Sequence, residues 1–75
     1  MTELQKRIVV NLRGWAKRRK IPISHVPDRA GLSRSYFWDI LAGRRSPTLQ
    51  WIEAITKVLE IDAVDLFRPP GPAKG

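Results

Sequence analysis

The amino-acid sequence predicts an all-α protein, a compact bundle of five helices. Two segments repeat apolar residues at spacings of three and four, as the buried stripe of a helix does: Leu4, Ile8, Leu12 and Trp15 in the first, and Leu49, Ile52, Ile55 and Leu59 in the second. Between them, residues 24–43 have the pattern of two short helices around a glycine turn. A short fifth helix completes the bundle.

Length and composition bound the protein class. The chain has 75 residues and no cysteine, so disulfides and thiolate metal sites are excluded and a reducing compartment fits. No apolar run approaches the roughly 18 residues of a membrane span, and the N-terminus does not have the pattern of a signal peptide. We expect one cytoplasmic domain over residues 1–67 and a disordered Pro/Gly tail over residues 68–75.

The first two helices are separated by a proline. The first ends in the basic run 17–20, which suits the negative end of the helix dipole, and Pro22 forbids smooth continuation. Ser24 is a good N-cap residue and would place Pro27 in the first turn, where no intrahelical hydrogen bond is lost. We expect a short helix from Ser24 or His25 to Ala30.

The third helix is predicted over residues 33–42. Gly31 suits the left-handed residue that ends the preceding helix, Ser33 caps the next one, and Gly43 ends it. One face of this helix is apolar: Phe37, Ile40 and Leu41. The other face carries Ser35, Trp38, Asp39 and Ala42, with Arg34 at the helix start.

The last two helices have equally clear starts. Thr48 caps the fourth helix, which runs through about Leu59. Ile61 is buried in the following turn. The fifth helix begins at Asp62 or Ala63 and ends near Phe67.

Charge is distributed unevenly along the chain. The net charge is +7, but residues 1–45 hold eleven basic against three acidic residues, whereas residues 46–75 hold three against four. A basic half suits a polyanion on one face. The alternative is a merely solubilising surface.

Residues 8–67 resemble the helix-turn-helix of the phage-repressor (Cro-like, XRE-type) regulators. The resemblance rests on the spacing of buried residues around Gly31, on Gly43 followed by Ser46 and Pro47, and on the order of the five helices. The buried set is Val26, Ala30, Leu32, Phe37 and Ile40. Three positions depart from the family pattern: Pro27 replaces a small alanine, Ile23 a polar residue and Leu41 a glutamate.

The resemblance implies that the third helix lies in the major groove of double-stranded DNA. Its base-contacting residues would be Arg34, Ser35, Trp38 and Asp39. Arginine pairs bidentately with guanine, serine bonds several bases, aspartate accepts from cytosine and the tryptophan covers a thymine methyl. Alternatively, Arg34 holds a phosphate, Asp39 is solvated, and Trp38 serves a dimer interface.

Phosphate contacts are expected from groups that border the groove. The candidates are Ser33, Tyr36, Arg44, Arg45, Ser46, Arg18 and Arg19. For the basic run 17–20 the alternative is that it only neutralises a helix dipole, and Tyr36 is alternatively partly buried.

Trp51 and Trp38 are the dimer candidates. Trp51 lies off the predicted stripe and should be partly exposed, as aromatic interface anchors are. The alternative is that Trp51 lies flat over neighbouring aliphatic side chains. His25 has no partners at metal-ligand spacing, so we predict no metal and no cofactor.

These features predict a transcriptional regulator that binds a palindromic operator as a homodimer. A second protein is a possible regulatory partner. The alternative is a protein-interaction module, such as an antitoxin or adaptor, on the same scaffold. The sequence has no pair of carboxylates at catalytic spacing, no Gly-rich phosphate loop and no cysteine. It therefore suggests neither an enzyme nor a small-molecule substrate. Nothing in the sequence suggests a membrane partner.

Overall fold

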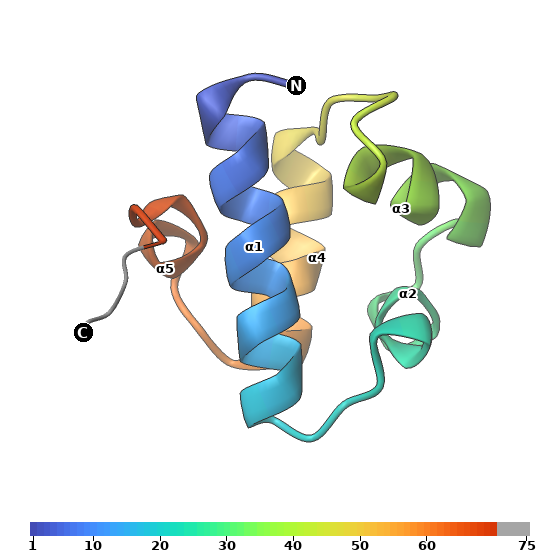
Figure 1. Cartoon of the computed structure of the whole chain (residues 1–75). Helices are drawn as coiled ribbons and strands as arrows, with labels where there is room; N and C mark the ends of the chain where they lie inside the picture. Colours follow the sequence, from blue (N-terminus) through green and yellow to red (C-terminus); the bar gives the residue numbers. More distant parts are fainter. Residues whose placement is uncertain (71–75) are drawn as a thin grey trace.

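A computed structural model describes residues 1–70, within which the chain forms five α-helices, one short 3₁₀ turn and no strands. The elements are α1 (Glu3–Arg18), η1 (Ile23–His25), α2 (Val26–Ala30), α3 (Arg34–Leu41), α4 (Leu49–Leu59) and α5 (Ala63–Phe67). In Figure 1, α5 lies against α1 on one side of the molecule, while α2 and α3 lie on the other side, with α2 packed on α4. The predicted all-α, five-helix architecture is confirmed.

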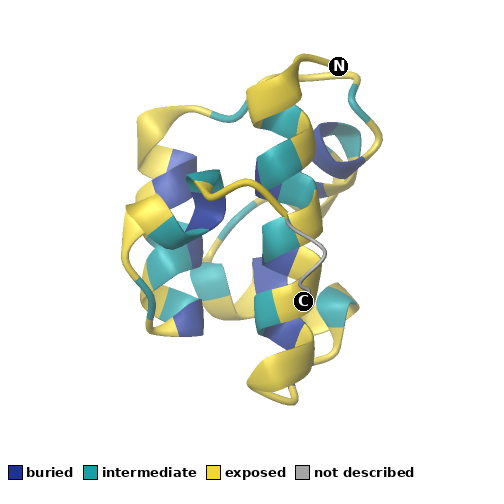
Figure 2. Ribbon diagram, turned by 60° about the vertical axis from the view of Figure 1, so that its left-hand side comes forward, coloured by how far each residue is buried: buried dark blue, intermediate teal, exposed yellow. Residues whose placement is uncertain are grey.

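One hydrophobic core joins all five helices, and the buried segments of the ribbon face it (Figure 2). Its fully buried side chains are Trp51, Phe37, Leu12, Ile55, Leu59, Leu66, Val26 and Pro27. Burying one large apolar side chain stabilises a fold by about 1.5–3 kcal/mol. The α3 helix is therefore anchored to the scaffold through its apolar face.

Side-chain caps set the helix starts. The Thr2 hydroxyl accepts a hydrogen bond from the Gln5 N–H at 3.1 Å, and the Thr48 hydroxyl accepts one from the Trp51 N–H, also at 3.1 Å. Each cap satisfies an N–H that has no partner inside its helix. The predicted cap at Thr48 is confirmed.

The buried face of α4 contains Ile52, Ile55 and Leu59 as predicted, but its first buried residue is Trp51 and not Leu49. Leu49 is 80% exposed, whereas Trp51 is only 2% exposed. At about 100° per residue, Trp51 lies on the same side as Ile55, and Leu49 lies about 160° away from Trp51. Leu49 is also the first residue of the helix, so its side chain has no neighbouring turn to cover it.

Two other predictions near helix starts are wrong. Leu4 is 52% exposed, because it lies one turn beyond Ile8, the first buried residue of α1. Ser24 caps nothing, since it lies inside the 3₁₀ turn and α2 starts at Val26. Pro27 does occupy the first turn of α2, as predicted.

The C-terminal end of the described chain is attached to α1. The Asn11 amide donates to the carbonyls of Leu66 and Arg68 at 2.8 and 2.9 Å, and the Arg68 guanidinium bonds the Asp65 carboxylate at 3.1 Å. Residues 71–75 of the predicted tail lie outside the described residues. Within residues 1–70, no helix combines the length and the apolar character needed to cross a lipid bilayer.

Candidate nucleic-acid interface

The turn before α3 fixes where that helix begins. Gly31 has φ +69°, which a residue with a side chain rarely adopts, and the Leu32 N–H bonds the Pro27 carbonyl at 2.8 Å. Ser33 is extended, and its hydroxyl accepts from the Tyr36 N–H at 3.3 Å. The predicted turn and cap are confirmed, and the start of α3 is set by local hydrogen bonds.

The two faces of α3 divide as the sequence predicts. Phe37, Ile40 and Leu41 are buried in the core. Arg34 and Ser35 are exposed. Trp38 is 37% exposed, and its ring packs edge-on against Phe37 with the ring centroids 5.3 Å apart. The helix thus presents a charged, a polar and an aromatic side chain outside the core.

Arg34 is already paired within the protein. Its Nε donates to Oδ1 of Asp28 at 3.0 Å, and its Nη2 donates to Oδ2 of the same carboxylate. The hydrogen bond from Arg34 holds the pKa of Asp28 below its ordinary value, and the same bond raises the pKa of Arg34. Sequence reasoning missed this pair, because the two residues are six apart across a turn and helical periodicity does not bring them together.

Asp39 lies close to the two arginines that follow α3. Its Oδ1 accepts from Nε of Arg44 at 3.1 Å, and its Oδ2 lies 3.5 Å from Nε of Arg45. The arginine side chains remain 67% and 62% exposed, respectively. One carboxylate therefore orients two cations and leaves the group with a net positive charge.

The loop after α3 is held at further points. The Tyr36 hydroxyl donates to the Ser46 carbonyl at 2.9 Å, and the Gln5 amide donates to the Ser46 hydroxyl at 2.9 Å. The Arg45 guanidinium lies 5.6 Å from the centre of the Tyr36 ring. Gly43 supplies the positive φ, +82°, with which the loop begins. Arg44, Arg45 and Ser46 are thus positioned next to the end of α3.

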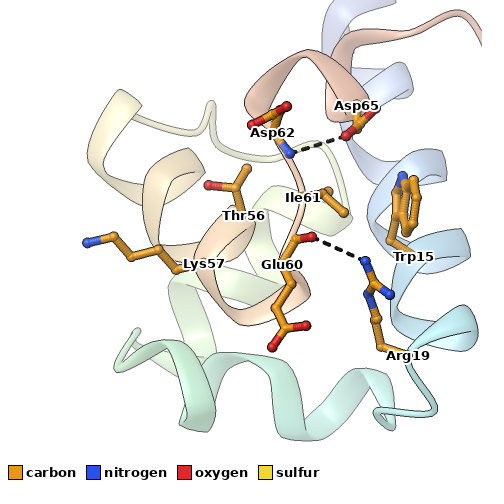
Figure 3. A pocket seen from close by; sticks show the side chains of 8 residues that line it. All are labelled: Trp15, Arg19, Thr56, Lys57, Glu60, Ile61, Asp62 and Asp65. Carbon is orange, nitrogen blue, oxygen red and sulfur yellow. Dashed lines mark hydrogen bonds between the residues drawn. The ribbon is translucent and has the colours of Figure 1, made fainter.

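Arg18 is the last residue of α1, and Arg19, drawn in Figure 3, follows it as the C-cap. Arg19 donates from Nε to the Leu59 carbonyl at 2.7 Å and from Nη2 to the Glu60 carbonyl at 3.1 Å. The guanidinium carbons of Arg18 and Arg19 lie 4.8 and 5.3 Å from the Trp15 ring centre. The bonds from Arg19 lie at the negative end of the α4 dipole, which is compatible with the alternative that the basic run neutralises a helix dipole.

Beside Arg19 is an open hollow of about 470 Å³. Figure 3 shows its lining from α1, α4 and the turn into α5: Trp15, Arg19, Thr56, Lys57, Glu60, Ile61, Asp62 and Asp65. Glu60 follows the last residue of α4 with φ +57°, and its carbonyl accepts one of the two hydrogen bonds that Arg19 donates. The hollow therefore lies at the capped C-terminal end of α4.

Trp51 is no dimer anchor. Its side chain is 2% exposed, its ring centre lies 5.9 Å from that of Phe37, and its Nε1 is buried with no hydrogen-bond partner among the described residues. The predicted exposure of Trp51 was wrong because the predicted stripe began at Leu49, whereas the buried residues of α4 are Trp51, Ile52, Ile55 and Leu59. Trp38 remains the exposed tryptophan of the two.

Comparison with known proteins identifies one similar solved structure and one matching family. It is similar to the crystal structure of a hypothetical transcription factor, NHTF, from Neisseria, with 24% identity and a TM-score of 0.82, over 91% of this chain and 78% of that one. A search of curated proteins found no match. The family described as helix-turn-helix domain matches residues 7–67. This match confirms the resemblance deduced from the turn at Gly31 and the helix order, and the chain belongs to the helix-turn-helix domain family.

Proposed function

We propose that this protein is a transcriptional regulator that binds double-stranded DNA sequence-specifically with α3 in the major groove. The observation that carries the proposal is the division of α3: its apolar side is buried, while Arg34, Ser35 and Trp38 stay outside the core. An anchored helix with exposed polar residues at its start is what base reading in a groove requires. The similarity to a protein named as a transcription factor supports the same function.

Base contacts fall to three residues in this proposal. Arg34 reads guanine, Ser35 bonds a base edge, and Trp38 covers a thymine methyl. Asp39 takes a different role from the predicted one, because its carboxylate is hydrogen-bonded to Arg44 and ion-paired with Arg45. Its function in this proposal is to orient those arginines.

Phosphate contacts come from both ends of α3. Ser33 and the N–H groups of the first turn lie at one end, and Arg44, Arg45 and Ser46 follow the other. Tyr36 supports the second group through its bond to the Ser46 carbonyl. Such contacts fix the register of a protein on DNA without reading sequence. Arg18 and Arg19 are assigned to the scaffold.

A homodimer on a palindromic site completes the proposal. One helix-turn-helix reads only a few base pairs, and two copies with half-sites about one helical turn apart supply the missing specificity. We assign no catalytic step to this chain, and its partner is DNA.

A second candidate function is that of a protein-interaction module. It is favoured by exposed apolar side chains away from α3, with Leu49 at 80%, Val64 at 54% and Leu4 at 52% exposure. A module of this kind would bind DNA weakly, and the binding would vanish as salt rises.

Selection of bound duplexes from a random pool at moderate salt tests the proposal. The wild-type chain should enrich a palindromic sequence, and Arg34→Ala should lose about 1–3 kcal/mol of preference at one base position. Arg13→Ala, which removes an exposed arginine from α1, should leave the consensus unchanged. Equal weakening of all sequences by Arg34→Ala would contradict the base-reading role, and no enrichment by the wild-type chain would contradict the function.

A further inference from the structure

We propose that Asp28 is a specificity-determining residue: it positions Arg34 for guanine and prevents that arginine from serving as a general phosphate contact. The inference rests on the proposed function. It is carried by the two-point contact between the side chains, Nε to Oδ1 at 3.0 Å and Nη2 to Oδ2.

The hydrogen-bonding capacity of the guanidinium explains how Arg34 can bind both Asp28 and a base. An arginine has five N–H donors in a planar fork. Asp28 takes the Nε donor and one of the two Nη2 donors. The outer edge keeps both Nη1 donors and the second Nη2 donor. That edge provides the two parallel N–H groups that bind O6 and N7 of guanine.

The carboxylate stands on a firmly held turn. Asp28 is the third residue of α2, directly after Pro27, which is fully buried. Gly31 in the left-handed conformation and the bond from the Leu32 N–H to the Pro27 carbonyl close the turn behind it. Arg34 begins α3, whose start is fixed by the Ser33 cap. Both partners therefore project from backbone held by hydrogen bonds, and their two-point contact restricts the Arg34 side chain before DNA binds. Arg34 then loses less side-chain entropy when it contacts a base.

The charge of Asp28 changes what Arg34 can bind. A phosphate that approached the guanidinium would also approach a carboxylate held against it, and like charges repel. A guanine edge carries no net charge and meets no such barrier. An aspartate is ionised at neutral pH, and the hydrogen bond from Arg34 lowers the pKa of Asp28 further.

The two acidic partners on this side of the molecule therefore act differently. Asp28 binds one arginine and neutralises it, whereas Asp39 binds two and leaves a positive charge. In the free protein the exposed Asp28–Arg34 pair adds little stability, since its side chains are 51% and 69% accessible. Its consequence is in recognition: Arg34 discriminates bases, while Arg44 and Arg45 supply charge.

A double-mutant cycle with duplex selection tests this inference. The wild-type chain, Asp28→Asn, Arg34→Ala and the double variant are each run against one random duplex pool, and the affinity for each base at each position is derived. Affinity for a duplex of random sequence is measured over a salt series. Asp28→Asn keeps the size of the side chain and removes its charge.

We expect Asp28→Asn to reduce the preference for guanine at the position that Arg34→Ala relaxes, by about tenfold, or about 1.4 kcal/mol. The same variant should bind the random duplex more tightly, with a salt slope steeper by about one unit, because Arg34 becomes free to contact a phosphate. In the Arg34→Ala background, Asp28→Asn should leave the base preference unchanged. This loss of effect separates positioning through Arg34 from a general structural role.

Two further variants serve as controls. Glu53→Gln changes the net charge by the same amount on an exposed side chain of α4 that makes no ion pair within residues 1–70, and it should leave base preference unaltered. Asp28→Glu keeps the charge in the first turn of α2 but displaces the carboxylate. It should lose part of the guanine preference even if Asp28→Asn proves unstable to heat.

The outcomes are distinct. A guanine preference that survives Asp28→Asn undiminished overturns the inference and leaves the proposed function intact. Equal weakening at every base position also overturns it, since that pattern marks a damaged fold. A wild-type chain that enriches no sequence contradicts the proposed function and the inference together.

Discussion

Two pairs of adjacent arginines in this chain have different environments. Arg18 and Arg19 end α1, and Arg19 donates to two backbone carbonyls at the end of α4 while both guanidinium groups lie near Trp15. Arg44 and Arg45 follow α3 and share the carboxylate of Asp39, with 67% and 62% of their side chains exposed. The same dipeptide stabilises helix ends in one place and presents charge in the other.

All four arginines are exposed, so the difference lies in their polar partners: backbone carbonyls for Arg19, and the Asp39 carboxylate for Arg44 and Arg45. Carbonyl oxygens at a helix end use the donors of Arg19 for the fold. A carboxylate shared by Arg44 and Arg45 orients their donors and leaves several of them free. We therefore separate the molecule into a scaffold side, formed by α1, α4 and α5, and a proposed recognition side, formed by α3 and the loop that follows it.

The largest expected effect separates two tryptophans. Trp51→Ala removes a fully buried ring from the scaffold and should lower the free energy of unfolding by about 3–5 kcal/mol. Trp38→Ala removes a partly exposed ring from α3 and should cost less than about 2 kcal/mol of stability while weakening DNA binding. Denaturant unfolding monitored by circular dichroism measures the unfolding free energy of both variants. Equal destabilisation by Trp51→Ala and Trp38→Ala would contradict the division into two sides.

The next effect concerns the charge on the recognition side. Arg44→Ala and Arg45→Ala should weaken binding to all duplexes alike, and each should flatten the dependence of log affinity on log salt concentration by about one unit. The matched change Arg18→Ala on the scaffold side should leave the slope in place. A salt titration of duplex affinity provides the test. If Arg18→Ala flattens the slope as strongly as Arg44→Ala, the assignment of the two arginine pairs is wrong.

A smaller effect is expected at the end of α4. Arg19→Met keeps much of the side-chain length and removes the donors to the Leu59 and Glu60 carbonyls. Because water can donate to these carbonyls in place of Arg19, we expect a loss of only about 1 kcal/mol in unfolding free energy. Duplex affinity should be unchanged. Thermal unfolding and a duplex-binding assay on the same sample provide the test. An unchanged melting temperature together with weakened duplex binding would contradict the assignment of Arg19 to the scaffold.

The smallest effect is that of acid. The hydrogen bond from Arg34 of α3 lowers the pKa of Asp28 in α2, and the hydrogen bond from Arg68 lowers that of Asp65 on the scaffold side. A lowered carboxylate pKa contributes stability above the unfolded-state pKa, and the contribution is lost as pH falls through the folded-state value. The melting temperature should therefore change little from these groups at neutral pH and fall below about pH 4.

Variants separate these two carboxylates. Asp65→Asn should lower the melting temperature near pH 7 and reduce its fall in acid, because the titrating group is gone. Asp28→Asn should do the same to a smaller extent, since the Asp28–Arg34 pair is the more exposed. A melting temperature of Asp65→Asn that falls in acid as steeply as that of the wild-type chain would contradict this account.

Local sequence signals predicted much of the fold. Gly31, Ser33 and Thr48 each act within a few residues of their own position, so their roles as helix end and caps follow from residue type. The first turn of α4 was harder, since the repeat of Ile52, Ile55 and Leu59 extends to Leu49, whereas the structure buries Trp51. Only the packing of the other helices decides which of the two is covered.

The interface was predicted less completely. Exposure of Arg34 and Ser35 follows from the helical pattern of α3. The pairing of Asp28 with Arg34 depends on how the turn folds. The bonds from Arg19 reach carbonyls forty residues further along the chain, which no local pattern encodes.

The three tryptophan indole N–H groups allow the most direct test of the proposed interface. Trp38 lies on α3, Trp15 beside Arg18 and Arg19, and Trp51 in the core. Titrating the ¹⁵N-labelled chain with its selected duplex and following the three indole signals reports all three regions at once. The account predicts that the Trp38 signal shifts most, with small changes for Trp15 and Trp51. A large shift of Trp15 with Trp38 unmoved would contradict it.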